Sequence, residues 1–274
     1  MSLLVQKETT LLKALIALYP ESSRRTLQNW IEKKRIQVDN QIVKKPHFIV
    51  KRGQKINLLK KDLCPLPVVY KDHFLIVIDK PCGLLSVPKD DSVERNALDV
   101  LKRHFADENI YAVHRLDQKT SGLMVFSRGK ASTKTLCQAF KKHEVQRVYY
   151  AVCEGALEKE EGLIESYLKE GKNLSMVSSQ NPDDGKKAIT EYKVLQKKAF
   201  STHLLLTLQT GKKHQIRVHL KDIGHPILAD KRYGCMHDPI GRLCLHATTL
   251  KLKHPDTNKE MVFTSPAPNN FKRI

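Results

Sequence analysis

The sequence lacks the cysteine pattern of a disulfide scaffold or a structural zinc site. Its six cysteines are dispersed through 274 residues, and no two of them form a Cys-x-x-Cys pair, the spacing typical of zinc ligands and redox pairs. The twelve histidines do not compensate, because His214 and His219 are five residues apart and no helical pair is joined by a carboxylate in a ligand spacing. We therefore expect no metal, and core positions for most of the cysteines.

Long apolar runs are also absent. No window reaches the roughly 18 uncharged apolar residues that span a bilayer, and the apolar patch at residues 11–18 is interrupted by Lys13. No small-residue cleavage site follows this patch. The patch therefore predicts an amphipathic helix of a cytoplasmic protein that does not enter a membrane. We find no internal repeat or low-complexity tract.

Positive charge is what the sequence has in excess. It holds 48 Lys and Arg against 29 Asp and Glu, a formal net charge of +19. Such an excess favours a polyanionic partner, because each neutralised phosphate releases condensed counterions. Nucleic acid is the expected partner, with a basic enzyme of another kind as the alternative. No obligate protein partner is inferred.

A small basic domain is predicted over residues 1–62. Residues 1–63 hold 14 Lys and Arg against 5 Asp and Glu. Threonines and serines that can cap helices precede two apolar stripes of helical spacing, which predict two short amphipathic helices. A hairpin is predicted over 36–42 and a second strand pair over 48–56.

This order of elements resembles the alpha-L RNA-binding motif, named for the fourth small-subunit ribosomal protein. The chain departs from the motif where Lys34 replaces its usual Gly, Asp39 and Asn40 its Asn-Gly, and Gln54 an Asp. The resemblance implies that the domain binds RNA. Basic residues along the second helix and its exit could follow an RNA backbone, or could form an ordinary solvated helix face: Arg24, Arg25, Lys33, Lys34 and Arg35.

A larger α+β domain is predicted over residues 63–274, after a linker near 60–67 that holds two prolines. Apolar or alternating segments predict strands over 68–70, 74–78, 111–113, 123–126, 149–153, 188–195, 202–208 and 248–252. Helices are predicted over 97–105, 131–142 and 214–221. Because strands outnumber helices and alternate irregularly with them, we expect a mixed, mainly antiparallel sheet with flanking helices.

The most informative stretch is HRLDQKTSGL, residues 114–123. Asp117 lies on a connection between two predicted strands, where a side chain can meet a ligand. His114 and Arg115 flank it, and a Thr-Ser pair follows, so the carboxylate can be held ionised and oriented without a metal. This arrangement suits a nucleophile. The alternative is a capped turn with a surface ion pair.

The stretch resembles the signature of the RluA-type pseudouridine synthases. Three further segments resemble the same family in the same order: DKPCGLLSVP at 79–88, RVYYAV at 147–152 and GKKHQIRVHL at 211–220. The resemblance implies an enzyme that draws a uridine out of its RNA stack, detaches the uracil, turns it and rejoins it through carbon, with no cofactor. Large-subunit ribosomal RNA is the implied substrate, because relatives with such a module mostly act there. Transfer RNA, or a non-catalytic RNA-binding or ribosome-assembly factor, are the alternatives.

The resemblance also implies roles for single residues. Asp117 would be the nucleophile, and the planar guanidinium of Arg217 would pair with it, unless Arg217 forms a structural ion pair elsewhere. Tyr149 would place its ring against the uracil, and Tyr150 competes for this role from the opposite side of the strand. Arg115 would enter the stack that the base vacates.

Four further residues are candidates for supporting or contacting the substrate. His114 is implied to support the loop, and Leu245 to pack near the base. A core imidazole and a core leucine are the alternatives. Lys212 and His214 are candidates for direct contact with the RNA.

The chain departs from the catalytic family at two places. Lys212 and Lys213 replace an Arg-Thr pair, so a bidentate phosphate contact there gives way to a point charge. Ala229 stands where glycine is usual. A hydrolase that uses Ser121 and a histidine is a weaker interpretation, because Ser121 lacks the small-residue elbow around an acyl-transfer serine.

Overall fold

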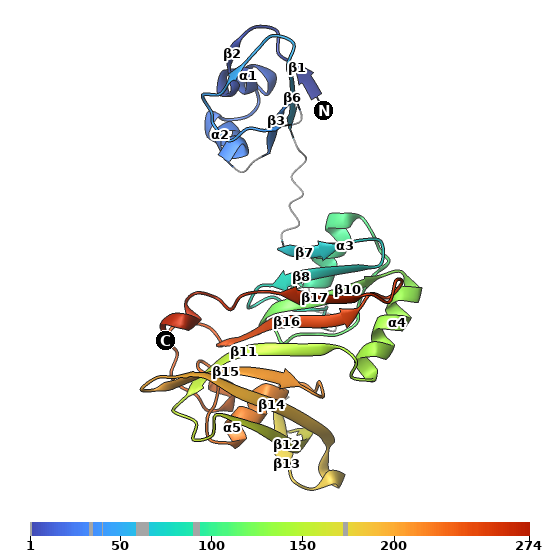
Figure 1. Ribbon diagram of the computed structural model, residues 1–274, viewed down its shortest axis with the longest axis vertical. Helices are drawn as coiled ribbons and strands as arrows, with labels where there is room; N and C mark the ends of the chain where they lie inside the picture. Colours follow the sequence, from blue (N-terminus) through green and yellow to red (C-terminus); the bar gives the residue numbers. More distant parts are fainter. Residues whose placement is uncertain (1, 33–34, 40, 59–65, 90–93, 172–174) are drawn as a thin grey trace. The chain divides into compact units, whose positions relative to one another are not determined.

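The computed structural model describes the chain except residues 1, 33–34, 40, 59–65, 90–93 and 172–174. The chain divides into two compact units, Met1–Leu63 and Cys64–Ile274 (Figure 1). No helix in the described part of the chain has the length and apolar character needed to cross a membrane.

Two capped helices pack on small sheets in the first unit. The hydroxyl of Thr10 accepts a hydrogen bond from the backbone N–H of Lys13 (3.4 Å), and that of Ser23 accepts one from Thr26 (3.2 Å). Both bonds satisfy donors that a helix start leaves open. The apolar stripes of both helices lie in one core with the strands, as the helical spacing predicted. The helices are α1 (Leu11–Leu18) and α2 (Arg24–Glu32).

The strands of the first unit form a sheet of order β1-β6-β3-β4 and a separate β2–β5 pair. The predicted hairpin is present as β3–β4, and the carboxylate of Asp39 at its turn accepts a hydrogen bond from the N–H of Lys55 (2.8 Å). Asn40 lies outside the described residues. The predicted pairing within 48–56 is wrong, because β5 pairs with β2 while β6 lies between β1 and β3. The strands are β1 (Ser2–Leu4), β2 (Thr9–Thr10), β3 (Ile36–Val38), β4 (Gln41–Ile42), β5 (Ile49–Val50) and β6 (Lys55–Leu58).

An 11-stranded, mainly antiparallel sheet forms the second unit and confirms the α+β prediction. Its order is β13-β12-β14-β15-β11-β16-β10-β8-β7, with β17 beside β16, β9 beside β10, and a parallel β10–β16 pair. The eight predicted strands are present, and β12, β13 and β17 were not predicted. The strands are β7 (Val68–Lys71), β8 (Leu75–Lys80), β9 (Ile110–Ala112), β10 (Ser121–Arg128), β11 (Gln146–Glu154), β12 (Glu161–Glu170), β13 (Met176–Ser179), β14 (Lys186–Lys197), β15 (Ser201–Leu208), β16 (Leu245–Lys253) and β17 (Glu260–Thr264).

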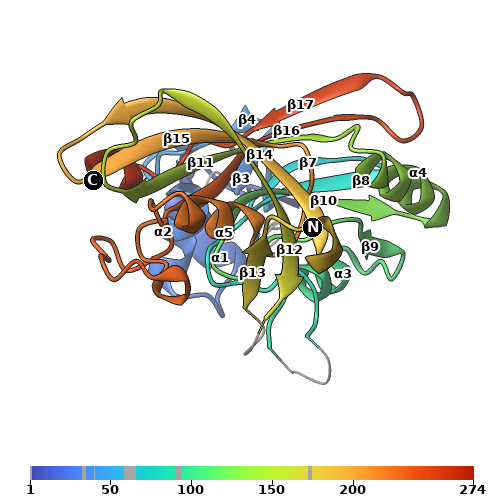
Figure 2. The ribbon, with the colours of Figure 1, turned by 90° about the horizontal axis from the view of Figure 1, so that it is seen from below.

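Alternation along the strands divides the core between two faces of this sheet. On β8, Ile76 and Ile78 pack in the cluster that holds α3 and α5 residues, whereas Leu75 and Val77 pack in the cluster that holds Leu136 of α4. Figure 2 shows α3 and α5 beneath the sheet. This places the start of α5 near the connection from β9 to β10. The helices are α3 (Ala97–Phe105), α4 (Lys130–Lys141) and α5 (Gln215–Asp222), with short 3-10 turns η2 (Pro182–Asp184), η3 (Lys231–Tyr233) and η4 (Phe271–Arg273).

Candidate active site

The connection between β9 and β10 carries Asp117 and is held from both sides. The hydroxyl of Ser86 donates a hydrogen bond to the carbonyl of Leu116 (2.7 Å) and accepts one from its N–H (3.0 Å). The buried ammonium of Lys80 donates to the carbonyl of Gln118 (3.3 Å). These bonds fix the backbone on either side of Asp117, whose side chain is 22% exposed.

Gly122, the second residue of β10, lies at a close approach between two strands. It has a φ of +113°, and a Cβ there would lie 2.3 Å from the carbonyl oxygen of Ala247 on β16. Only glycine combines this φ with so close a neighbour. Gly122 therefore fixes the β10–β16 pairing, and with it the end of the loop that carries Asp117.

Arg217 of α5 is the cation nearest to this carboxylate. Its Nε and Nη2 donate to the two oxygens of Asp230 (2.7 and 2.8 Å), and its Nη1 lies 3.5 Å from Oδ2 of Asp117. The guanidinium carbon lies 4.9 Å from the ring centre of Tyr233. Burial alone would lower the pKa of Arg217, but the hydrogen bonds and charge of Asp230, together with Asp117, raise it above its usual value. Arg217 thus stays charged although only 5% of the residue is exposed.

His214 approaches the same carboxylate from the residue before α5. Its Nε2 lies 3.9 Å from Oδ2 of Asp117, and its Nδ1 lies 2.7 Å from the hydroxyl of Tyr233. Burial lowers the pKa of His214 to about 4, against the raising effect of Asp117. The imidazole is therefore neutral at neutral pH.

Tyr149 of β11 forms part of the wall of the site, and its neighbour does not. Burial raises the pKa of Tyr149 to about 12, so its phenol keeps its proton at neutral pH. Tyr150 points to the opposite side of the strand, where its hydroxyl lies 2.6 Å from Nδ1 of His203.

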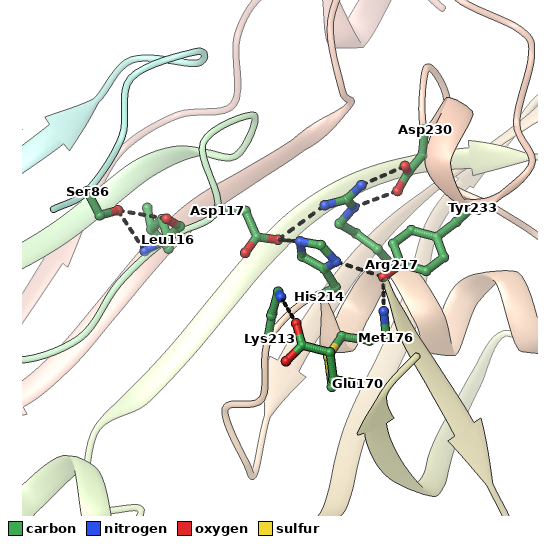
Figure 3. A network of polar contacts seen from close by, with 10 residues as sticks. All are labelled: Ser86, Leu116, Asp117, Glu170, Met176, Lys213, His214, Arg217, Asp230 and Tyr233. Carbon is green, nitrogen blue, oxygen red and sulfur yellow. Dashed lines mark hydrogen bonds and ion pairs between the residues drawn. The ribbon is translucent and has the colours of Figure 1, made fainter. Parts of the chain in front are cut away.

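These residues surround a small pocket of about 60 Å³ that opens to solvent. Figure 3 shows Asp117, His214 and Arg217 turned toward one another. Seven of the eight residues predicted for catalysis or substrate contact line the pocket: Arg115, Asp117, Tyr149, Lys212, His214, Arg217 and Leu245.

His114 is not part of the pocket lining. Its Nε2 accepts a hydrogen bond from the N–H of Val125 on β10 (3.1 Å), and its ring stacks on Phe140 with 4.6 Å between ring centres. Burial, and then the charge of Arg147, lower the pKa of His114 to about 3. The neutral imidazole is thus an acceptor that ties the start of the loop to β10.

Three of the five residues predicted to bind RNA in the first unit are described by the structure, and they lie on α2 or shortly after it. Arg24 and Arg25 are exposed in its first turn. The guanidinium of Arg35 lies over the ring of Trp30, 5.2 Å from its centre. Lys33 and Lys34 lie outside the described residues.

Asp230 and Tyr233 orient Arg217 and His214, and neither residue was predicted from the sequence. Both follow Ala229 in the segment HPILADKRYG, where only the missing glycine was noted. Ala229 has a φ of +65°, a backbone conformation in which glycine carries no steric penalty. The usual glycine at this position therefore indicates a turn, and Asp230 lies directly after it, but the glycine pattern does not predict that Asp230 binds Arg217.

Comparison with known proteins gives matches for both units. Residues 74–222 match the family model of RNA pseudouridylate synthases, and residues 10–56 match that of the S4 domain. "Ribosomal large subunit pseudouridine synthase D" of Haemophilus influenzae is 31% identical over 96% of this chain and 89% of its own length. The protein of the same name from Nitrosomonas europaea is 34% identical over 96% of this chain and 82% of its own length.

The solved structures include a protein of similar fold. "Human RNA Pseudouridylate Synthase Domain Containing 1" superposes with a TM-score of 0.63, at 24% identity, over 74% of this chain and 84% of that chain. At this level of identity the likeness concerns the fold alone.

Proposed function

We propose that this chain, which belongs to the RNA pseudouridylate synthase family and is an RNA pseudouridine synthase, isomerises uridines of large-subunit ribosomal RNA. Two relatives named for the large ribosomal subunit align with 96% of the chain, so the likeness extends over the S4 domain as well as the sheet. The net charge of +19 favours a long polyanionic substrate.

Asp117 is the proposed nucleophile. Its carboxylate can add to C6 of uracil or displace the uracil from C1′ of the ribose. By either route the N1–C1′ bond breaks, the uracil turns within the pocket, the C5–C1′ bond forms, and the bond between Asp117 and the substrate breaks again. One proton leaves C5 and one is placed on N1, so atoms and charge balance without a further reactant.

The observation that carries this proposal is the contact of Asp117 with Arg217 at the edge of an open pocket. The guanidinium of Arg217 lies 3.5 Å from Oδ2 of this carboxylate, so a cation faces the proposed nucleophile. Tyr149 and Leu245 line the same pocket and offer apolar surface against which a flipped uracil can pack. Arg115 is exposed and can reach into the RNA stack from which the base has left.

A basic groove next to the pocket is suited to the RNA backbone beside the target uridine. It has a volume of about 610 Å³ and shares Lys212 with the pocket. Four lysines and one acid, Glu170, lie in its lining. Lysine side chains neutralise phosphates without reading sequence, so the groove would position the strand and leave the choice of uridine to other contacts. The lysines are Lys169, Lys186, Lys212 and Lys213.

The proposal is tested by mapping pseudouridines in cells that lack the protein. The cells are complemented with the wild-type chain, with Asp117→Asn, or with Asp256→Asn, which changes an exposed acid between β16 and β17. We expect sites in large-subunit ribosomal RNA to disappear in the deletion strain. The wild-type chain and Asp256→Asn should restore them, and Asp117→Asn should not.

Other outcomes would contradict separate parts of the proposal. Loss of sites only in transfer RNA would refute the substrate. Restoration by Asp117→Asn would refute the nucleophile, provided that the variant's amide has not reverted to the acid by deamidation, which mass spectrometry checks.

A further inference from the structure

A line of polar contacts connects the nucleophile with β13, a strand that sequence analysis did not predict. The backbone N–H of Met176 donates to the hydroxyl of Tyr233 (3.0 Å), and this hydroxyl lies 2.7 Å from Nδ1 of His214. Nε2 of His214 in turn points at Asp117 (Figure 3).

The chemistry of the donors sets the direction of these hydrogen bonds. A backbone N–H only donates, so Met176 occupies one lone pair of the Tyr233 oxygen. The phenol proton then has Nδ1 of His214 as its acceptor, and no second acceptor for it lies among the described residues. Nδ1 is therefore unprotonated, and the single proton of the neutral imidazole is on Nε2, facing Asp117.

Arg217 and His214 both approach the same oxygen of Asp117. Nη1 of Arg217 and Nε2 of His214 lie 3.5 and 3.9 Å from Oδ2. Within the described part of the chain, no residue donates a hydrogen bond to Oδ1. Such contacts often shorten only when the substrate closes the site, so the present distances are those of an open pair.

We propose that His214 is a positioning residue that, together with Arg217, holds Oδ2 of Asp117 and so leaves Oδ1 as the attacking atom. This inference rests on the proposed role of Asp117 as nucleophile. Arg217 supplies the charge and His214 a neutral N–H, and donors from two directions restrict the rotation of the carboxylate more than one donor does. Tyr233 is the group that sets the tautomer of His214.

Surrounding charges favour this neutral imidazole. Burial is the main cause of its lowered pKa, Arg217, Arg232 and Lys213 lower it further, and Asp117 acts in the opposite direction. Between pH 6 and pH 8 the imidazole of His214 therefore stays neutral and does not become a cation.

Two substitutions separate this role from a structural one. In His214→Gln the amide nitrogen can occupy the place of Nε2 and donate to Asp117. In His214→Asn the shorter amide can reach only the place of Nδ1 and the hydroxyl of Tyr233. His214 has a φ of +56°, which Asn tolerates better than Gln, so Asn should give the more stable protein.

The experiment compares kcat, KM and thermal unfolding of the full-length variants on an RNA that the wild-type enzyme modifies. We expect His214→Gln to keep most of kcat, and His214→Asn to lose about 100-fold, the scale of a misplaced reacting group. KM for RNA should change little in either variant. Tyr233→Phe, which keeps the ring against Arg217 but loses the hydroxyl, should lower kcat less than His214→Asn.

The expected order of activity, Gln above Asn, is opposite to the expected order of stability. Equal loss of kcat in both variants, or activity that follows stability, would overturn the positioning role. Absence of product with the wild-type enzyme on ribosomal RNA would instead overturn the proposed substrate and leave this role to be measured on whichever RNA is modified.

Discussion

Asp230→Asn tests whether a buried acid maintains the cation beside the nucleophile. The side chains of Arg217 and Asp230 are 6% and 2% exposed, and two hydrogen bonds join them. The substitution keeps the shape of the side chain but removes the charge. Arg217 then stays in a buried site with Asp117, at 3.5 Å, as its remaining acidic partner.

The expected cost is that of breaking a buried ion pair, about 3–5 kcal/mol, because one charge stays behind without its full compensation. For a unit of this size about 1 kcal/mol lowers the melting temperature by roughly 2–4 °C, so we expect a fall of roughly 10 °C. The rate should also fall, since a guanidinium no longer held by Asp230 can turn away from Oδ2 of Asp117.

The double variant Arg217→Gln/Asp230→Asn separates the two effects. It replaces the ion pair with a neutral amide pair that can keep one hydrogen bond, and replacement of both charges is commonly near neutral for stability. We expect the melting temperature of the double variant to regain most of what Asp230→Asn loses. Its activity should stay as low as that of Arg217→Gln. Unfolding in urea and single-turnover rates measure the two quantities. A loss below about 1 kcal/mol in Asp230→Asn, or regained activity in the double variant, would refute this account.

Three further expectations follow from other residues. Ala229→Gly relieves the positive φ and should raise the unfolding free energy by up to about 1 kcal/mol, and a decrease would show that the lost methyl contacts matter more. The pKa of His114 is lowered to about 3 in the folded protein, so the unfolded chain binds the proton more readily, and the contribution of His114 to stability is present above about pH 6.5 and lost as pH falls towards 3. His114→Gln should therefore reduce the slope of unfolding free energy against pH by up to about 1.4 kcal/mol per pH unit between about pH 6 and 4. An unchanged slope would contradict this expectation. Lys186→Ala in the groove should reduce the steepness with which the logarithm of RNA affinity falls with the logarithm of salt concentration by about 0.7 to 0.9. Lys134→Ala, on the exposed side of α4, should leave this slope unchanged. Equal slopes in the two variants would argue against RNA binding in the groove.

The position of Asp117 could be predicted because it depends on local patterns. Apolar runs on both sides of residues 114–123 predicted β9 and β10, and the Gly of TSGL corresponds to a real contact between Gly122 and β16. A connection between two such strands must lie at an end of the sheet. Tyr149 faces the pocket and Tyr150 faces the opposite side of β11, as the alternation of side chains along a strand requires.

The supporting residues could not be predicted, because they depend on contacts distant in sequence. Asp230 lies on a turn with no periodicity, and nothing in its neighbourhood distinguishes it from an exposed acid. The alternation of β12 is concealed because Leu163 is exposed and Ser166 is buried, and β13 has only four residues, none of them charged. The partner of β5 in the first unit was predicted wrongly because β2 and β5 have two residues each, which is too little pattern to define a partner.

Ser121 shows why residue types alone do not identify a nucleophile. Its hydroxyl lies 2.8 Å from Nδ1 of His246, whose Nε2 lies 3.1 Å from Ser265, and Ser265 donates to Asp79 (2.6 Å). This resembles the serine, histidine and acid of a hydrolase. However, Ser121 is only 4% exposed, its oxygen also accepts a hydrogen bond from Arg242 (2.7 Å), and it is not in the lining of the pocket.

The directions of these bonds complete the distinction. With a neutral His246, the proton of Ser121 goes to Nδ1, Nε2–H donates to Ser265, and the last proton reaches Asp79, so every donor has an acceptor. A fully satisfied chain, in which Ser121, His246 and Ser265 are buried, stabilises the start of β10 and has no vacant position for a substrate. Asp117, four residues earlier, is partly exposed at the pocket and has one oxygen without a donor among the described residues, which is the difference between a structural polar chain and a site that can react.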